Sequence, residues 1–286
     1  MTAVVLVHGI AQQVRGPESL LDDWYPALAD GLALHGVTPP DRAAVSMAFY
    51  GDVFRPPGHR GVGLPELTAD DVTDPVERDL LLAWWEHAAE QQPAVPGPRD
   101  PGARLRTPHV VQRALDALSH SAFFAGLSER LMIASLRQVR RYLTEPATRD
   151  AVRQRLAALV TAETRVVVAH SLGTVVAYET LAAARPEWRD IALVTLGSPL
   201  AIRNVVFDRL LPAPTDGRAH WPASVSRWTN IADRGDVVAL VKTLAPRFGD
   251  RVTDLPVHNG AQAHDVRPYL TARETGQAVA AGLTRR

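Results

Sequence analysis

Hydrophobic positions along the chain follow two patterns. Short β-branched runs without polar alternation are typical of strands covered on both faces, and apolar residues three or four positions apart are typical of helices. Strands that alternate with helices indicate βαβ units, and therefore an α/β fold with a mostly parallel central sheet flanked by helices. The predicted strands are 2–7, 43–51, 165–169, 191–197, 224–231 and about 251–257. The helices predicted outside the middle of the chain are 18–35, 146–162, 173–184, 201–211 and 271–283.

The middle of the chain, residues 52–145, departs from this alternation, because proline and glycine crowd two parts of it. One helix is predicted over 74–91, where an aspartate N-cap precedes a first-turn proline. A second helical region is predicted over 108–143. We therefore expect an α/β core built from 1–51 and 146–286, with a helical cap inserted at 52–145. Prominent apolar residues of the two helical regions are Leu80, Leu81, Trp84, Trp85, Phe123, Phe124, Leu127, Leu131, Leu136 and Val139.

Composition narrows the function classes. The chain has 286 residues, 46% hydrophobic and 22% charged, which is ordinary for a packed globular protein. Its 31 basic residues, of which only Lys242 is a lysine, balance 31 acidic ones. No long-range field therefore favours an anionic partner, and we expect no nucleic-acid binding. The absence of cysteine excludes thiol nucleophiles, disulfides and Cys-ligated zinc.

The apolar N-terminal stretch "MTAVVLVHGI" resembles a strand more than a targeting signal. It has no basic flank and no small-residue cleavage site. No segment approaches the roughly 20 apolar residues of a membrane-spanning helix. We therefore expect a cytoplasmic protein without stable membrane insertion.

Reactive residue types gather directly after the predicted strands. Ligands of open α/β sheets bind beyond the carboxyl ends of the strands, so these positions are the candidates for a site. In chain order they are His8-Gly9-Ile10, His170-Ser171-Leu172-Gly173, Gly197-Ser198-Pro199, Asp233 and Asp236, and His258 and His264.

Ser171 stands between a predicted strand and a predicted helix, with Ala169 two residues before it and Gly173 two residues after. This is the pattern of a nucleophile elbow, in which the flanking residues are small because strand and helix come very close. A serine at this place can also simply cap the helix. The order serine, acid, histidine, each after a successive strand, favours the nucleophile.

Together these segments resemble α/β-hydrolases of the lipase/esterase type. "VVLVHGI" resembles the strand and oxyanion turn of such enzymes, "AHSLGT" their elbow, and "TLGSPL" a strand-end signature frequent in lipase-like members. "NIADRGDVVA" and "AHDVRPYL" resemble their acid and histidine segments. The resemblance covers roughly 1–50 and 146–286, and Ala169 replaces the more usual glycine.

The resemblance implies a role for each matching residue. Ser171 would be the nucleophile and His264 the base that takes its proton. Asp236 would orient the imidazole of His264. The backbone N–H groups of Ile10 and Leu172 would form the oxyanion hole.

Alternatives exist for the acid and the base. Asp236 is favoured over Asp233 because "DVV" matches the family's acid followed by two apolar residues. Asp233 also suits a turn former around Gly235. His264 is favoured over His258 because the family's histidine likewise precedes a helix that bears a tyrosine.

The other polar residues at the strand ends have structural interpretations. We expect His8 to brace the oxyanion turn, His170 to pack beside the elbow and point away from the substrate, and Ser198 to shape the site. The sequence contains no HEXXH motif, Walker loop or GxGxxG after the first strand. We therefore expect no metal and no nucleotide or other cofactor.

The predicted function is that of a serine hydrolase that cleaves a carboxylic ester through an acyl-enzyme on Ser171. A small-molecule acyl ester or thioester is the expected substrate. Thioester or amide hydrolysis and acyl transfer would use the same groups, and a non-catalytic interaction protein of this fold is a further alternative. The cap could enclose an apolar substrate, whereas Trp84 and Trp85 could equally serve to pack it onto the core.

Overall fold

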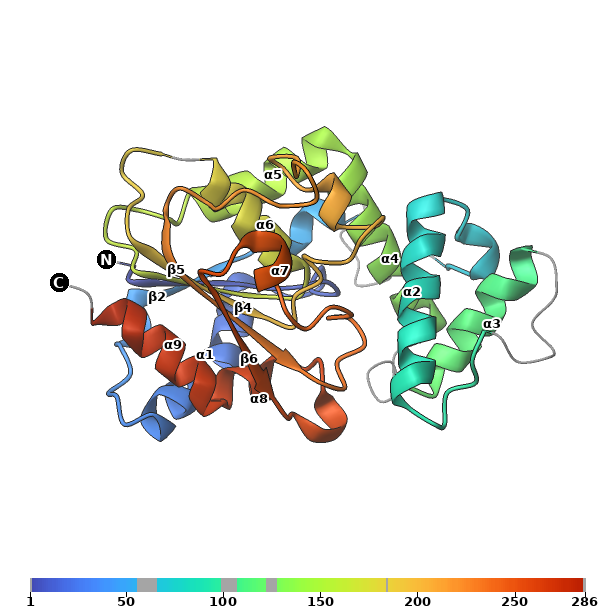
Figure 1. The fold of residues 1–286 in the computed structure, drawn as a ribbon, viewed down its shortest axis with the longest axis horizontal. Coiled ribbons are helices and arrows are strands. Elements are labelled where there is room, and N and C mark those ends of the chain that lie inside the picture. Colours follow the sequence, from blue (N-terminus) through green and yellow to red (C-terminus); the bar gives the residue numbers. More distant parts are fainter. Residues whose placement is uncertain (1, 56–65, 99–106, 122–127, 184, 285–286) are drawn as a thin grey trace.

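The structure is a computed structural model. It describes residues 2–55, 66–98, 107–121, 128–183 and 185–284 (Figure 1). Part of the predicted helical region 108–143, including Phe123, Phe124 and Leu127, lies outside the described residues.

Six parallel strands form one sheet in the order β2-β1-β3-β4-β5-β6. The predicted parallel α/β architecture is therefore confirmed. Because β1 and β3 are neighbours, with Val7 opposite Ala169, the turn after β1 lies beside Ser171. The strands are β1 (Val4–Val7), β2 (Val45–Ala48), β3 (Val166–His170), β4 (Ile191–Leu196), β5 (Val225–Asp233) and β6 (Val252–Val257).

Helices cover both faces of the sheet (Figure 1). On one face lie α1 (Pro17–Leu34), α8 (Val266–Thr271) and α9 (Arg273–Leu283), and on the other α5 (Pro146–Ala157) and α6 (Leu172–Ala182). Alternate residues of β1 face the two layers: Val4 and Leu6 pack with α1, α8 and α9, whereas Val5 and Val7 pack with α5 and α6. This two-sided burial explains why the strands read as continuous hydrophobic runs.

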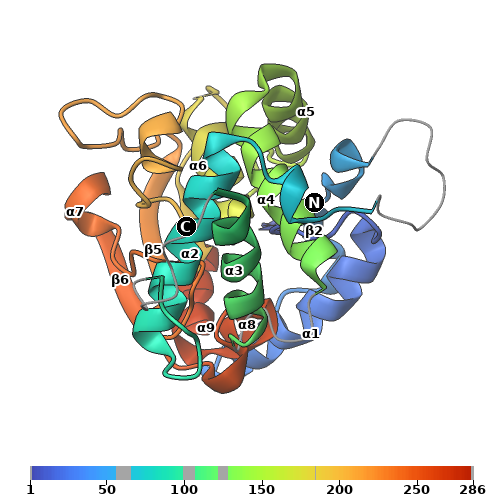
Figure 2. The ribbon, with the colours of Figure 1, turned by 90° about the vertical axis from the view of Figure 1, so that its right-hand side faces the viewer.

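The predicted insertion contains three helices, α2 (Pro75–Gln91), α3 (Thr107–Ser119) and α4 (Glu129–Thr144). Of these, α2 and α3 lie beyond the edge at which the strands end, while α4 runs from there back onto α6 (Figure 1). Helices α2 and α3 stand in front of the sheet when it is viewed from that edge (Figure 2). The predicted region 108–143 therefore contains two helices within the described residues. No described helix is long and apolar enough to cross a membrane.

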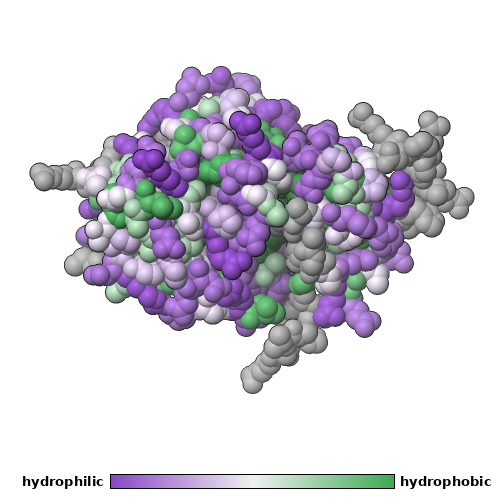
Figure 3. All heavy atoms as spheres, turned by 90° about the horizontal axis from the view of Figure 1, so that it is seen from below, coloured by the Kyte–Doolittle hydropathy of each residue, from purple (hydrophilic) through white to green (hydrophobic). Residues whose placement is uncertain are grey.

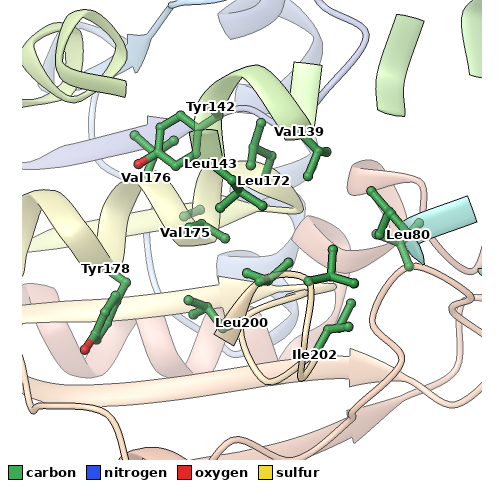
Figure 4. Close-up of a cluster of buried hydrophobic side chains, with 14 of the residues drawn as sticks. Leu80, Val139, Tyr142, Leu143, Leu172, Val175, Val176, Tyr178, Leu200 and Ile202 are labelled. Atoms are coloured by element: carbon green, nitrogen blue, oxygen red, sulfur yellow. The ribbon is translucent and has the colours of Figure 1, made fainter. Parts of the chain in front are cut away.

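The insertion shares a hydrophobic core with the rest of the molecule. Val139, Tyr142 and Leu143 of α4 lie against residues of α6, among them Leu172 and Val175 (Figure 4). Trp84 and Trp85 of α2 are each 2% exposed and belong to the same cluster. These tryptophans therefore pack α2 into the core.

The prediction of a helix over 201–211 is wrong. This segment forms turns and one 3-10 helix, η4 (Phe207–Arg209), because Asn204 adopts a left-handed conformation with φ +64°. The side chain of Asp208 accepts the Asn204 N–H at 2.6 Å and stabilises that turn. The predicted helix 271–283 is confirmed as α9 (Arg273–Leu283), which begins directly after Ala272, whose extended ψ of 136° separates α9 from α8. A short helix, α7 (Ala245–Phe248), was not predicted.

Candidate active site

Ser171 occupies a strained turn between β3 and α6, with φ 55° and ψ −130°. A non-glycine residue in such a region costs on the order of 1–3 kcal/mol and persists only where surrounding contacts enforce it. Those contacts are very close: a Cβ at Gly9 would lie 2.7 Å from Cβ of Ser171, and one at Gly173 would lie 2.6 Å from the carbonyl oxygen of Val7. Gly9 and Gly173 are therefore required by the close approach of the backbone around the serine.

Asp236 and His264 form a buried pair. Nδ1 of His264 donates to Oδ2 of Asp236 at 2.7 Å, and the two residues are 4% and 0% exposed. Oδ1 of the same carboxylate accepts the backbone N–H groups of Val238 at 2.8 Å and Ala239 at 3.1 Å. Burial alone would raise the pKa of Asp236, but the His264 contact, the charge of Lys242 and the Ala239 N–H lower it to about 2. The carboxylate is therefore ionised, and Nε2 of His264 is the nitrogen that can take a proton.

Lys242 stabilises the segment that carries this acid. Its Nζ donates to the backbone carbonyl of Asp236, and its own carbonyl accepts Nδ2 of buried Asn230 at 2.9 Å. Burial lowers the pKa of Lys242, while Asp236 and Asp233 act in the opposite direction. Across this segment lies His87 of α2, whose pKa is lowered by burial and by the charge of Lys242.

Ser171 and His264 line one cavity of about 350 Å³. The end of β4 approaches the Asp236–His264 pair very closely. A Cβ at Gly197 would lie 2.7 Å from Oδ2 of Asp236 and 3.0 Å from Nδ1 of His264. The loop after β1, the first turns of α1 and the start of α8 form most of the wall. The lining residues are Gly9, Ile10, Ala11, Gln12, Arg15, Leu20, Asp23, Trp24, Ser135, His170, Ser171, His264, Asp265, Val266 and Arg267.

Two ion pairs belong to the cavity wall. Arg15 pairs with Asp23, and Nη2 of Arg267 lies 2.8 Å from Oδ2 of Asp265. The face of the molecule that carries α1, α8 and α9 is mostly hydrophilic, with hydrophobic residues in small separate groups (Figure 3). The cavity wall thus combines apolar residues with charged groups that are already paired.

The turn that carries Ile10 is held by α4. Oε1 of Gln138 accepts the Ala11 N–H at 3.1 Å, and its Nε2 donates to Oε1 of Gln13 at 2.8 Å. Ile10 lines the cavity, and Leu172 follows Ser171 as the first residue of α6. Sequence reasoning missed Gln138, because nothing local relates a residue of α4 to a turn 127 positions earlier.

His8 braces this turn from behind, as the sequence analysis expected. Its Nδ1 contacts the carbonyl of Gly9 at 2.7 Å, and its Nε2 accepts the Tyr50 N–H at 3.1 Å. The Tyr50 hydroxyl in turn donates to the backbone carbonyl of His8, and the two rings stack at 3.9 Å. Burial lowers the pKa of His8 to about 4, so the ring is neutral and donates through Nδ1.

His170 packs beside the elbow but does not point away from the site as expected. It lines the cavity, and its ring centroid lies 4.6 Å from that of His264. Its Nε2 donates to the backbone carbonyl of His264 at 3.0 Å. Burial, together with His264, lowers the pKa of His170 to about 3. His170 is therefore a neutral donor that holds the loop of His264 against the end of β3.

The alternative acid and base lie together, apart from the cavity. Asp233 accepts the Gly235 N–H at 2.6 Å, the turn-forming contact that the sequence suggested, and its other oxygen accepts the Asn259 N–H. His258 is highly exposed, with a side chain 89% accessible, and its Nδ1 lies 3.9 Å from Oδ2 of Asp233. Neither residue lines the cavity that contains Ser171.

Ser198 connects the end of β4 to the elbow. Its Oγ lies 2.9 Å from Oγ1 of Thr174, which donates to the carbonyl of Ser171 at 2.8 Å. Ser198 also accepts the Leu200 N–H at 3.2 Å. These contacts fix the first turn of α6 and so support the position of Ser171.

No group of three or more His, Asp or Glu side chains suitable for a metal ion occurs among the residues that the structure describes. No family model matches the chain, and no curated protein matches its sequence. The functional interpretation therefore depends on the geometry of the site.

Proposed function

We propose that the protein is a serine hydrolase of the α/β-hydrolase fold that cleaves carboxylic esters, with residues 52–145 as its cap. The observation that carries this proposal is the buried 2.7 Å contact between His264 and Asp236, beside a cavity that His264 and Ser171 both line. The strained backbone of Ser171 at the start of a helix supports it, since nucleophile elbows have this geometry.

In the acylation step, Oγ of Ser171 attacks the ester carbonyl carbon while its proton passes to Nε2 of His264. Asp236 stabilises the imidazolium that forms, because its carboxylate is ionised and hydrogen-bonded to Nδ1. The negative oxygen of the tetrahedral intermediate is stabilised by the N–H groups of Ile10 and Leu172. The intermediate collapses when the leaving alkoxide takes the proton from His264 and departs as the alcohol.

Deacylation repeats these steps with water. Water transfers a proton to His264 and attacks the acyl carbon, and the oxyanion again lies at the N–H groups of Ile10 and Leu172. Collapse releases the carboxylic acid, and the proton of His264 returns to Oγ of Ser171. A thiol leaving group or an acceptor alcohol would use the same groups.

The cavity bears on which substrates fit. Its volume of about 350 Å³ is near the lower end of the range for ligand pockets. Of the insertion, Ser135 on α4 is among its lining residues, whereas Trp84 and Trp85 are buried in the core. These tryptophans therefore contribute to packing, and the apolar wall comes from residues such as Leu20 and Trp24 of α1.

The test is covalent labelling with a fluorophosphonate probe, followed by rates on p-nitrophenyl esters and acyl-thioesters of graded length. We expect the wild type to be labelled and active and Ser171→Ala to be neither, because the variant lacks the oxygen that forms the acyl-enzyme. The ratio of ester to thioester rates identifies the bond. Folded wild-type protein that reacts with neither probe nor substrates would contradict the proposal and favour a non-catalytic binding protein.

A further inference from the structure

The carboxylate of Asp236 has a second side-chain donor besides His264. The hydroxyl of Tyr269, on α8, lies 2.8 Å from Oδ2 of Asp236, the same oxygen that accepts Nδ1–H of His264. The hydroxyl oxygen also accepts the Asp233 N–H at 2.8 Å. Since that N–H can only donate, the single proton of the hydroxyl is directed at the carboxylate.

This arrangement is enclosed by the protein. Tyr269 and Asp236 are both 0% exposed. With Val238 and Ala239 on Oδ1, the carboxylate accepts four hydrogen bonds, two on each oxygen. Its hydrogen-bonding capacity is therefore filled.

Close backbone contacts set the position of Tyr269. A Cβ at Gly31 of α1 would collide with the carbonyl oxygen of Leu270, and a Cβ at Gly276 of α9 would collide with the carbonyl of Gly31. Oγ1 of Thr275 donates to the Tyr269 carbonyl at 2.6 Å. Helix α8 is thereby packed closely on α1, which fixes the backbone position from which the Tyr269 side chain reaches Asp236.

We propose that Tyr269 is a positioning residue of the site, which holds the Asp236 carboxylate toward His264 and takes up part of its negative charge. The inference depends on the proposed hydrolase function for its catalytic meaning. Without the hydroxyl, Oδ2 would serve His264 alone and would stabilise the imidazolium more strongly. His264 would then keep its proton to a higher pH, while the carboxylate would be less well oriented.

Other ionisable groups also face the Asp236–His264 pair, from several elements. None of them is altered by Tyr269→Phe, and burial raises the pKa of the Tyr269 hydroxyl, so the substitution removes a neutral group. A change in His264 titration would therefore report the lost hydrogen bond. The facing groups are His170 at the end of β3, Asp233 and Lys242 on or after β5, His87 on α2 and Asp265 at the start of α8.

Tyr269→Phe tests the proposal, with Tyr178→Phe as the matched control. Tyr178 is also fully buried, and its hydroxyl donates to the backbone carbonyl of His220 at 2.9 Å, away from the site. The readouts are the titration of the His264 imidazole by NMR, which needs no turnover, and the pH profile of kcat/KM. We expect Tyr269→Phe to raise the His264 midpoint and the acid limb of the profile by about half a pH unit or more. We also expect kcat to fall about tenfold with KM little changed, and Tyr178→Phe to change neither.

If the His264 titration is the same in folded Tyr269→Phe protein as in the wild type, the proposal is overturned. The hydroxyl would then serve only as the hydrogen-bond acceptor of the Asp233 N–H at the end of β5. If the titration moves but wild-type protein cleaves no ester, the positioning contact stands and the hydrolase proposal fails. The two inferences therefore have separate tests.

Discussion

At the scale of single residues, the site depends on a position without a side chain. Gly197 follows β4 with φ +54°, and a Cβ there would lie within 3.0 Å of both Asp236 and His264. Real Cβ atoms essentially never approach other atoms more closely than this. The hydrogen-bonded pair can therefore form only because this residue is glycine.

Gly197→Ala is expected to lower kcat/KM by on the order of 10²-fold, because the methyl group displaces the imidazole or the carboxylate. Gly36→Ala is the matched control. Gly36 also has a left-handed φ, +83°, but no atom lies within 4 Å of a Cβ built there. Both variants carry a backbone strain of about 1–2 kcal/mol, visible in urea unfolding. Equal losses of esterase activity in the two variants would show that strain alone, and not displacement, explains the effect.

The candidate site residues could be predicted from the sequence because the strand-end rule is local. Ser171, Asp236 and His264 each follow a hydrophobic run, and the parallel sheet brings those ends together. The hydroxyl of Tyr269 on Asp236 could not be predicted from this rule, since the contact spans 33 residues and depends on how α8 packs against α1.

At the scale of elements, α4 links the insertion to the turn after β1. Gln138 is 6% exposed, accepts the Ala11 N–H and donates to Gln13. Ala11 has a left-handed φ of 61°, so this hydrogen bond supports a strained backbone directly after Ile10. The position of α4 is thus coupled to the geometry of the proposed oxyanion hole.

Gln138→Met, which keeps the length of the side chain but removes both hydrogen bonds, is expected to lower kcat about tenfold, because buried polar groups lose their partners. Gln138→Glu still offers an oxygen to the Ala11 N–H, and the amide of Gln13 can turn to donate to it. We therefore expect the Glu variant to retain more activity than the Met variant in p-nitrophenyl ester assays. Full activity in Gln138→Met would mean that the turn holds its shape without α4.

Helices could be predicted where an apolar stripe determines the conformation, but not where a side-chain contact stabilises a turn instead. The predictions over 18–35 and 74–91 agree closely with α1 and α2. The segment 201–211 has the same apolar spacing, but the contact between Asp208 and the Asn204 N–H favours a turn. Likewise the start of α4 depends on a local contact, since the Ser128 side chain accepts the Leu131 N–H at 3.3 Å.

At the scale of the whole molecule, one hydrophobic cluster extends from α2 through α4 and α6 to β5. A second cluster joins α1, α8 and α9 to the opposite face of the sheet. Two buried neutral histidines, His8 and His170, lie at the end of the sheet where strands and loops meet. Their protonation therefore affects the stability of the whole fold.

Stability is expected to fall as the pH is lowered from about 6.5 toward 4. In the unfolded chain both histidines take up protons near their ordinary pKa of 6.5, whereas in the folded protein their pKa values are about 4 and 3. The unfolded state thus binds more protons in this window, and each histidine lowers the free energy of unfolding by up to about 1.4 kcal/mol per pH unit. Urea unfolding at several pH values measures this slope. His170→Gln, which can still donate to the His264 carbonyl, should reduce the slope by the contribution of one histidine. If the free energy of unfolding depends on pH equally in the two proteins, this explanation is contradicted.

Because Lys242 is the only lysine of the chain, proteolysis can report on the motion of the segment that carries Asp236. A lysine-specific endoprotease has one cleavage point in this sequence, after Lys242. In the folded protein that peptide is held at both ends of the residue, through Nζ on the Asp236 carbonyl and through its own carbonyl on Asn230. Cleavage requires the segment to open. The rate of this single cleavage therefore reports how readily the segment that carries Asp236 opens. The measurement uses the unmodified protein and needs no added label.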